Sequence, residues 1–234
     1  MSITEMVFRP GLALDDLVTA VDDVQQQMYQ AGETVFTEGD TDDRLYVVVD
    51  GKVALGCHCE DGRQCVFAVV GRSEMFGEES ALDHGPRTSC AVTLTQVEVI
   101  CIPRQVLRSW LAADPGMTDQ IFRVMARRIR RSHNRITDVA YADVPSRVAK
   151  NLLGLAQQFG VQRDGDIVVT TDLTQEQFAQ LVGTTRESVN KALCEFSERG
   201  WIQTDGTTIV IHDSAPLSGR VHGVRNGRPP CTSI

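Results

Sequence analysis

The chain has 234 residues, of which 42% are hydrophobic and 23% charged, a composition typical of a folded globular protein. No apolar run approaches the roughly 20 residues of a bilayer-spanning helix, and the N-terminus lacks a basic segment followed by an apolar one, so we expect a cytoplasmic protein with no membrane partner. The seven cysteines are scattered and odd in number, which favours reduced thiols over a disulfide framework.

The net charge of -8 is distributed unevenly along the chain. Residues 1–100 hold 18 acidic and 6 basic side chains, a balance of -12, whereas residues 101–234 hold 13 and 17, a balance of +4. The two parts are therefore expected to carry different functions, and the overall negative charge does not exclude nucleic-acid binding by the second part.

The first half of the chain reads as a short helix followed by many strands. Leucines and valines at mixed helical spacing predict a helical segment within residues 11–30. After Gly32, short β-branched runs alternate with Gly and Asp turns, a pattern typical of an antiparallel barrel or sandwich. Asp61-Gly62 is the favoured pair for a two-residue hairpin turn. The predicted strands cover residues 34–36, 45–49, 53–57, 65–70, 89–92 and 97–102.

One segment between these strands, residues 75–82, is not strand-like and precedes a Gly-Pro-Arg-Thr-Ser sequence at residues 85–89. A glycine that opens a helical turn leaves backbone N–H groups suited to an anion, and Arg87 and Thr88 can add a planar guanidinium and a hydroxyl. Glu78 would repel a phosphate, but it can accept hydrogen bonds from sugar hydroxyls. Taken alone, the segment also fits a capped surface loop.

Residues 117–143 carry an apolar residue at every third or fourth position, which predicts a long amphipathic helix with a seam narrow enough for a coiled coil. Two copies would pair along this seam as a homodimer. Ser132, with His133 beside it, interrupts the seam, either to set register and oligomeric state or to contact a bound ligand. The six arginines of this helix are interpreted mostly as a solvated face. The predicted dimer interface comprises Ile121, Met125, Ile129, Ile136 and Val139.

A second domain is predicted to begin after Asp143, because Asp favours a helix start and Pro145 restricts the residue before it. Two further helix starts follow from capping-box spacing, one at Thr174 with Gln177 and one at Thr184 with Glu187. A glycine between them gives a helix-turn-helix arrangement.

The second of these helices is expected to present Arg186, Glu187, Asn190 and Lys191 outward near its N-terminus, where such a motif contacts base edges. Arginine and lysine can donate to guanine, and a glutamate can accept from cytosine. Two capped helices of an unrelated bundle are the alternative, but the intact turn spacing favours DNA binding. A hairpin wing is predicted to follow, and residues 214–234, rich in Pro, Gly, Ser and Arg, are predicted to be a flexible tail.

Residues 10–213 resemble the CRP/FNR family of transcription regulators, and within it the actinobacterial cyclic-AMP receptor protein-like regulators. The motifs that carry the resemblance are GEES and PRTS in the strand-rich part, RVMARRIRR and DVPSRVAK, and TQEQFAQLVGTTRESVNKAL. The resemblance implies an α+β fold: an N-terminal antiparallel β-roll that binds cyclic nucleotides (1–116), a long dimerisation helix and hinge (117–143), and a C-terminal winged helix-turn-helix (144–213). It also implies a homodimer without enzymatic activity that binds double-stranded DNA under allosteric control by cyclic AMP, with RNA polymerase as a further expected partner.

Carried over residue by residue, the resemblance places Glu78 on the ribose 2'-hydroxyl and Arg87 and Thr88 on the cyclic phosphate. Ser132 falls at an adenine-contacting position, and His133 falls where a neighbouring subunit adds a polar group. Glu79 departs from the family pattern with an extra negative charge, which is unfavourable near a phosphate unless the side chain turns to solvent. The implied cyclic AMP site comprises Gly77, Glu78, Glu79, Ser80, Arg87, Thr88, Ser132 and His133.

In the DNA domain, the resemblance places Arg186, Glu187 and Lys191 at base-reading positions. It places Thr174, Gln175 and Thr185 near phosphates. These base readers match a TGTGA-like half-site, and two-fold symmetry predicts a palindrome whose half-sites lie about one helical turn, roughly 34 Å, apart.

Several alternatives stay open at this point. A CRP-like regulator that does not need cyclic AMP could be constitutive, or could respond to another ligand or to thiol redox state. A ligand-binding module with a vestigial DNA domain would fail to shift a palindromic DNA. An enzyme is disfavoured because no Walker-type loop, HExxH or GxSxG sequence occurs.

A cluster of Cys57, His58, Cys59 and Cys65 raises the question of a metal or redox site. Strand alternation puts Cys57 and Cys59 on one face and His58 on the other, and a two-residue turn would put Cys65 opposite His58. Because the four side chains then do not converge, we expect incidental thiols and no metal.

Overall fold

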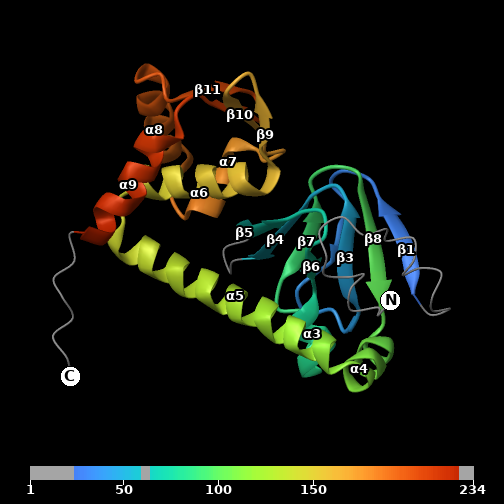
Figure 1. The fold of residues 1–234 in the computed structure, drawn as a ribbon. Coiled ribbons are helices and arrows are strands. Elements are labelled where there is room, and N and C mark those ends of the chain that lie inside the picture. The colour runs from blue at the N-terminus through green and yellow to red at the C-terminus, as the bar shows by residue number, and fades with distance from the viewer. Residues whose placement is uncertain (1–23, 59–63, 227–234) are drawn as a thin grey trace, which may run out of the picture. The chain divides into compact units, whose positions relative to one another are not determined.

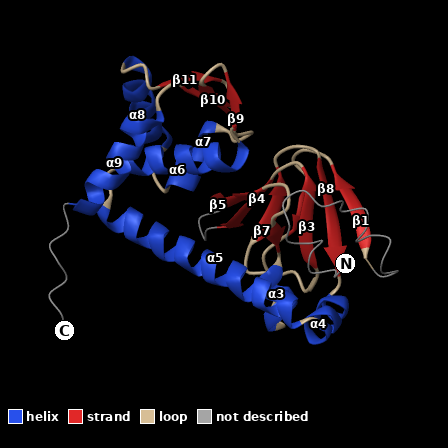
Figure 2. Ribbon diagram, viewed as in Figure 1, coloured by secondary structure: helices blue, strands red, loops and turns tan. Residues whose placement is uncertain are grey.

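The computed structural model describes residues 24–58 and 64–226. It forms two compact units, divided between Ile129 and Arg130. Strands dominate the first unit, whereas helices dominate the second (Figure 2). Among the described residues, no helix has the length and apolar character needed to cross a membrane.

The first unit is built on two four-stranded antiparallel sheets, ordered β1-β8-β3-β6 and β2-β7-β4-β5. The predicted runs coincide, within one residue at either end, with β2, β3, β4, β5, β7 and β8. The strands are β1 (Gln25–Tyr29), β2 (Thr34–Phe36), β3 (Leu45–Asp50), β4 (Val53–His58), β5 (Gln64–Val70), β6 (Met75–Phe76), β7 (Cys90–Thr93) and β8 (Val97–Ile102).

Strand β3 is buried on both faces, and it separates the two parts of the core. Tyr46 and Val48 pack in the cluster shared with the second sheet, which also contains Phe36, whereas Leu45 and Val47 pack against the helices α3 (Glu78–Asp83), α4 (Arg104–Ala113) and the start of α5. A strand with two buried faces reads as a continuous apolar run instead of an alternating one, as residues 45–49 do.

Two short strands correct the sequence prediction. Residues 25–29, expected to be helical, form strand β1, which pairs antiparallel with β8 at the edge of its sheet. Three glutamines give this segment no apolar period, so long-range pairing decides its conformation. Met75 and Phe76, described above as not strand-like, form the two-residue strand β6 opposite Val47 and Tyr46. The rest of the predicted N-terminal helix, residues 11–23, lies outside the described residues.

The hairpin of β4 and β5 also departs from its predicted register. Cys65 lies opposite Cys57, and not opposite His58, which pairs with Gln64. The cause is a β-bulge beyond Leu55, where Phe67 is the extra residue that shifts all later pairs by one. The predicted turn at residues 61–62 and the side chain of Cys59 lie outside the described residues.

Helix α5 (Pro115–Tyr141) is one continuous helix (Figure 1) and starts two residues before the predicted limit. Proline is well suited to the first helical position, because the N–H that it lacks would have no helical partner there. Ile121 is only 5% exposed and packs with Val106 and Leu107 of α4 in the core of the first unit. Its assignment to the dimer interface is therefore wrong, because the first turns of α5 cover the sheet.

The second unit continues from α5 with a winged helix-turn-helix. Asp143 caps α6 by accepting a hydrogen bond from the backbone N–H of Ser146 (2.9 Å), as the sequence predicts. The predicted wing is the β11–β12 hairpin, in a sheet ordered β11-β12-β10-β9. The elements are α6 (Val144–Phe159), β9 (Val161–Arg163), β10 (Asp166–Thr170), α7 (Gln175–Val182), α8 (Arg186–Glu198), β11 (Ile202–Asp205), β12 (Thr208–Ile211) and α9 (Ser214–Asn226).

Helix α9 replaces the first part of the predicted flexible tail, so that prediction is wrong for Ser214–Asn226. Leu217 is completely buried, and the Arg220 side chain forms an ion pair with Glu195 and lies over the ring of Trp201. One buried leucine and one stacked arginine give no visible helical period, so the sequence alone does not reveal this packing.

We expect Leu217→Ala to lower the free energy of unfolding of the second unit by about 2–5 kcal/mol, because it leaves a cavity under α9. Trp201 fluorescence during urea unfolding, in a Trp110→Phe background, would report this unit alone. Val161→Ala, at a position that is 56% exposed in the same unit, is the matched control and should change stability by less than about 1 kcal/mol. Equal stability of Leu217→Ala and the control would contradict the docking of α9.

Candidate functional site

A pocket of the first unit lies beside α3, between this short helix and the second sheet. All six residues of the first unit that the sequence assigns to ligand binding line it. Its walls are formed by Phe36, Leu55, Phe67, Gly77, Glu78, Glu79, Ser80, Arg87, Thr88, Ser89 and Arg128.

Gly77, immediately before α3, is required by its backbone and by its neighbours. Its φ of 76° lies in the left-handed region that favours glycine. A Cβ atom at this position would lie 2.5 Å from Nη1 of Arg87 and 3.2 Å from the carbonyl oxygen of Arg44. Any side chain here would therefore displace the arginine of the pocket.

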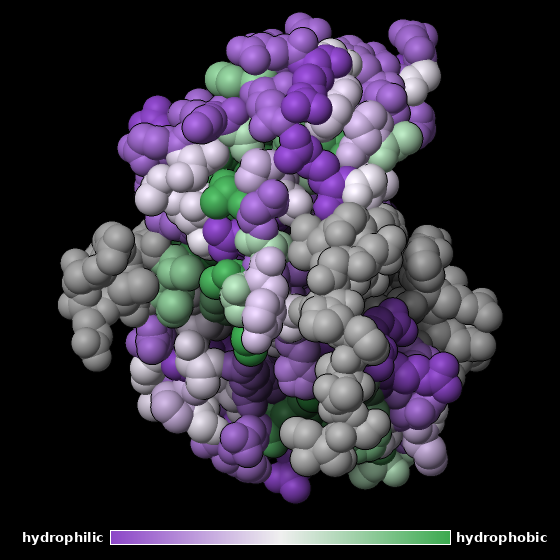
Figure 3. Space-filling view, turned by 90° about the vertical axis from the view of Figure 1, so that its left-hand side faces the viewer, coloured by the Kyte–Doolittle hydropathy of each residue, from purple (hydrophilic) through white to green (hydrophobic). Residues whose placement is uncertain are grey.

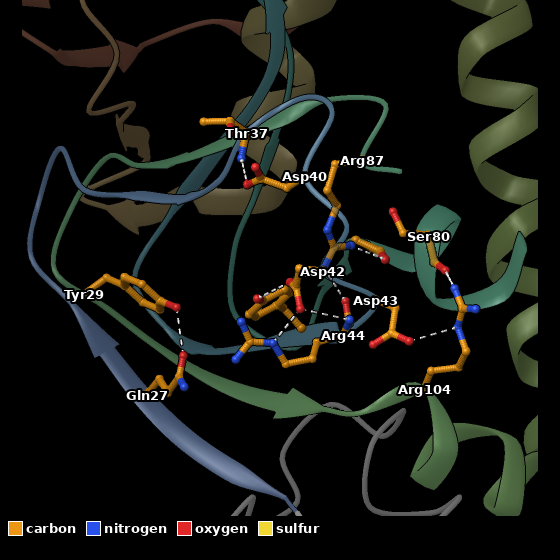
Figure 4. A network of polar contacts seen from close by, with 12 residues as sticks. Gln27, Tyr29, Thr37, Asp40, Asp42, Asp43, Arg44, Ser80, Arg87 and Arg104 are labelled. Carbon is orange, nitrogen blue, oxygen red and sulfur yellow. Dashed lines mark hydrogen bonds and ion pairs between the residues drawn. The ribbon is translucent and has the colours of Figure 1, made fainter. Parts of the chain in front are cut away.

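Arg87 is 2% exposed and is held on several sides. Its Nη1 donates to the carbonyl oxygen of Gly77 (2.7 Å), and its Nη2 donates to Asp42 Oδ2 (2.6 Å) and to the carbonyl oxygen of Arg44 (2.7 Å) (Figure 4). The guanidinium also lies 4.1 Å from the centroid of the Phe36 ring. These contacts fix the direction in which the guanidinium faces the pocket.

Asp42 is the acceptor on which this network converges, and no motif in the sequence points to it. Besides Arg87, it accepts hydrogen bonds from Arg44 Nε and from the Tyr46 hydroxyl, each at 2.7 Å. Burial alone would raise the pKa of Asp42, but the hydrogen bonds from Arg87, Tyr46 and Arg44 outweigh it and hold this pKa below its usual value. Asp42 therefore remains charged and balances the buried guanidinium; no local spacing connects it to residue 87.

Glu78 is the buried carboxylate of the pocket, with 4% exposure. Burial raises the pKa of Glu78, whereas the positive charge of Arg128 counteracts this effect. Arg128 donates to Glu78 Oε1 and to the carbonyl oxygen of Met75, so the interpretation of this arginine as solvated is wrong. A signal was available: Arg128 lies two helical turns after Ile121 and so on the same side of α5.

Three buried polar atoms of the pocket have no hydrogen-bond partner within the described part of the chain. They are Oε2 of Glu78, Oγ of Ser80 and Nε of Arg87. Buried polar atoms without a partner are rare in native proteins and mark places where a ligand or water completes the bonding. One carboxylate acceptor beside a guanidinium donor and a hydroxyl suits a ligand that carries both hydroxyl groups and anionic oxygens.

The two remaining predicted ligand residues of the first unit lie at the rim of the pocket. Glu79 is exposed, yet it lines the pocket, so its negative charge stays near the position predicted for a phosphate. The hydroxyl of Thr88, also exposed, donates to the Glu79 carboxylate. Contact between Thr88 and a phosphate stays a prediction.

Helix α5 carries an apolar stripe that is exposed except at the half-buried Met125, and its first residue differs from the predicted one. Phe122 is 68% exposed and takes the place of the buried Ile121. From Phe122 onward, successive residues of the stripe are alternately three and four positions apart, which is the heptad pattern of a coiled coil. Ser132 occupies one of the positions that would face a partner helix. His133, next to Ser132, is also exposed. The stripe comprises Phe122, Met125, Ile129, Ser132, Ile136 and Val139.

Large apolar side chains are seldom exposed on this molecule. The face drawn in Figure 3 is largely hydrophilic, with hydrophobic residues at the surface in a few small groups. Ile129, Ile136 and Val139 are each more than half exposed, so they are unusual among large apolar side chains of this molecule.

The helix-turn-helix begins as predicted. Thr174 and Gln177 form a reciprocal capping box at the start of α7, with the Gln177 N–H donating to Thr174 Oγ1 at 3.1 Å and the Thr174 N–H donating to Gln177 Oε1 at 2.9 Å. Gly183 ends α7 with a φ of 76°. The turn between the two helices therefore follows from local sequence alone.

The cap of the second helix differs by one residue from the prediction. Thr185, and not Thr184, caps α8 by accepting from the backbone N–H of Ser188 at 3.3 Å. The N–H of Thr184 instead donates to the carbonyl oxygen of Ala179 (3.1 Å), so Thr184 belongs to the end of α7. Only Thr184 has the capping-box spacing, with Glu187 three residues later, but its N–H takes part in the hydrogen bonding that closes α7, so Thr185 becomes the cap.

Two arginines hold the end of α7, where carbonyl groups lack helical partners. Arg147 Nη1 donates to the carbonyl oxygen of Gly183 (3.1 Å), and Arg135 Nη2 donates to that of Leu181 (2.9 Å). The interpretation of Arg135 as solvated is therefore wrong, and its partner lies 46 residues along the chain, so no local pattern predicts the contact. The turn is thus anchored to α5 and α6 within the second unit.

The recognition helix α8 buries Val189 and Phe196 and exposes Arg186, Glu187 and Lys191. The predicted base-reading side chains therefore share its exposed side. Nε of Arg186 donates to Oε1 of Gln175 at 2.8 Å. A hydrogen bond from its own backbone N–H, together with Thr185, lowers the pKa of Glu187, which favours the charged acceptor form.

Comparison with known proteins accounts for both units. Residues 26–114 match the cyclic nucleotide-binding domain family, and residues 146–219 match the Crp-like helix-turn-helix domain family. Over 192 residues the chain is 50% identical to the CRP-like cAMP-activated global transcriptional regulator of Mycobacterium tuberculosis, covering 82% of this chain and 86% of that one. It is 28% identical to the cyclic AMP receptor protein of Thermus thermophilus, covering 92% and 96%.

Solved structures share the fold. FixK2 from Bradyrhizobium japonicum superposes with a TM-score of 0.75 at 21% identity, covering 84% of this chain and 96% of that one. A CRP/FNR family transcriptional regulator from Thermus thermophilus superposes with a TM-score of 0.71 at 24% identity, covering 85% and 98%. With a cyclic nucleotide-binding domain and a DNA-binding helix-turn-helix in one chain, and half of its aligned residues shared with a curated regulator, this protein belongs to the CRP/FNR family of transcription regulators.

Proposed function

We propose that this regulator acts as a cytoplasmic homodimer that binds palindromic DNA with TGTGA-like half-sites when cyclic AMP occupies the roll, and that it contacts RNA polymerase there. The observation that carries the cyclic AMP part is the set of buried, unpartnered atoms on Glu78, Ser80 and Arg87. The name of the Mycobacterium tuberculosis relative, a cAMP-activated regulator, supports the same ligand.

In this proposal the chain itself supplies the chemistry that cyclic AMP needs. Oε2 of Glu78 accepts from the ribose hydroxyl, while Nε of Arg87 and Oγ of Ser80 donate to the cyclic phosphate. Thr88, Gly77 and Glu79 complete the rim. The adenine contacts Ser132 and His133, which lie on or beside the apolar stripe of α5.

The ligand would reach the dimer through two features of α5. Arg128 bonds to the same carboxylate that accepts the ribose, so a ligand at Glu78 changes the contact between pocket and helix. Ser132 sits at an inward position of the heptad stripe, so a base bound there changes how two helices pack. The changed packing is then transmitted past Asp143 to the recognition helices.

Calorimetry with cyclic AMP tests the ligand. Removing a buried hydrogen bond to a charged group weakens binding by about ten- to a hundredfold, which is the loss expected for Arg87→Ala. Because Arg87 also supports the fold, Ser80→Ala is the second variant, with a loss of roughly tenfold and little change in structure. Arg72→Ala, at an exposed position outside the pocket, is the control and should bind as the wild type does.

A folded wild type without binding heat would contradict cyclic AMP control. It would favour a regulator that is constitutive or that responds to another ligand or to thiol redox state. Normal binding by both pocket variants would instead contradict the assignment of the residues.

Gel shifts test the DNA site. Arg186→Ala should cost about 1–3 kcal/mol of binding free energy on the TGTGA palindrome and relax specificity at one guanine, because a bidentate donor pair is lost. Arg199→Ala, at the other end of α8, is the control and should keep both affinity and specificity. An equal loss on every DNA sequence would show that Arg186 does not read a base, and the absence of any shift would favour a vestigial DNA domain.

Sedimentation tests the dimer. Ile136→Glu should give a monomer that binds the palindrome weakly, because it places a charge at an inward position of the heptad stripe. Asn134→Glu adds the same charge two residues away, at an exposed position outside the stripe, and should remain dimeric. If Ile136→Glu stayed dimeric, the stripe would not be the interface.

A further inference from the structure

The first residue of α7 and the first residue of α8 are joined by a hydrogen bond between their side chains. Nε of Arg186 donates to Oε1 of Gln175 at 2.8 Å, and the amide nitrogen of Asn190 lies 3.5 Å from the same oxygen. Thr174 fixes the backbone beside Gln175 through its capping box, and Thr185 caps the helix that begins with Arg186. Both ends of this bond therefore rest on well-defined helix starts.

The orientation of the Gln175 amide follows from its partner. A guanidinium has only donors, so the amide atom that faces Arg186 is the oxygen. A phosphate has only acceptors and would bind the amide N–H₂, the other end of the same group. The contact in the structure is made by the amide oxygen and serves Arg186, while the phosphate contact that the family resemblance implied for Gln175 stays a prediction.

We infer that Gln175 is a positioning residue that aims Arg186 at a guanine, and this inference rests on the base-reading role proposed above for Arg186. With Nε engaged by Gln175, the two terminal nitrogens of the guanidinium remain for DNA, and they are sufficient for the bidentate contact to guanine O6 and N7. Arg186 is exposed and long, so without such a bond it would lose more side-chain freedom on binding DNA. Gln175 thereby contributes to specificity without touching a base.

Fluorescence anisotropy with two DNA duplexes tests this role. One duplex carries the TGTGA palindrome, and the other has the guanine read by Arg186 replaced by another base. That guanine is the position at which the Arg186→Ala variant no longer distinguishes between bases. Gln175→Ala should reduce the ratio of the two affinities about three- to tenfold, the value of one ordinary hydrogen bond, and leave binding to the substituted duplex unchanged. Gln175→Glu keeps an acceptor oxygen at the same reach, so it should retain the wild-type ratio while binding both duplexes more weakly through its added charge.

A double-mutant cycle provides the internal control. In an Arg186→Ala background, Gln175→Ala should have no further effect on the ratio, because the residue through which it acts is absent. An equal loss of affinity for both duplexes would assign Gln175 to a phosphate. A wild-type affinity ratio in Gln175→Ala would overturn the positioning role of Gln175 but not the base-reading role of Arg186. A wild-type protein that binds both duplexes equally would overturn the base-reading proposal and this inference together.

Discussion

The ion pair between the buried Arg87 and the half-buried Asp42 is the interaction on which the pocket depends. A guanidinium with 2% exposure is tolerable only when its charge is balanced and its N–H groups are bonded. Asp42 supplies the charge, and the carbonyl oxygens of Gly77 and Arg44 supply further acceptors. The same contacts exclude any side chain at Gly77, so the shape of the pocket and the position of its arginine are set together.

Arg128 connects this pocket to the long helix. It bonds to the carboxylate of Glu78, whose other oxygen is buried without a partner among the described residues, so one side chain faces both the helix and the proposed ligand. Further along the same helix, Ser132 interrupts an exposed apolar stripe. In the function proposed here, ligand binding and helix pairing use neighbouring residues of one helix, so ligand binding changes how the helices pair.

The second unit holds its helix-turn-helix by a different means. Arg135 and Arg147 satisfy the carbonyl groups at the end of α7, which would otherwise lack partners, and so fix the turn before α8. Helix α9 packs against α6, buries Leu217 and pairs Arg220 with Glu195 of α8. These contacts hold α8 and its N-terminal residue Arg186 in a fixed position, which is what base reading requires.

Features that depend on neighbouring residues could be predicted from the sequence: most strands of the roll, the Asp143 and Thr174 caps, the helix-turn-helix and its wing. The family motif also pointed to residues that line the pocket. Features that depend on distant partners could be seen only in the folded chain, since pairing and packing across the chain leave no local period. These are strand β1, the Cys57–Cys65 register, the exchange of Ile121 for Phe122, the roles of Asp42 and Arg128, and helix α9.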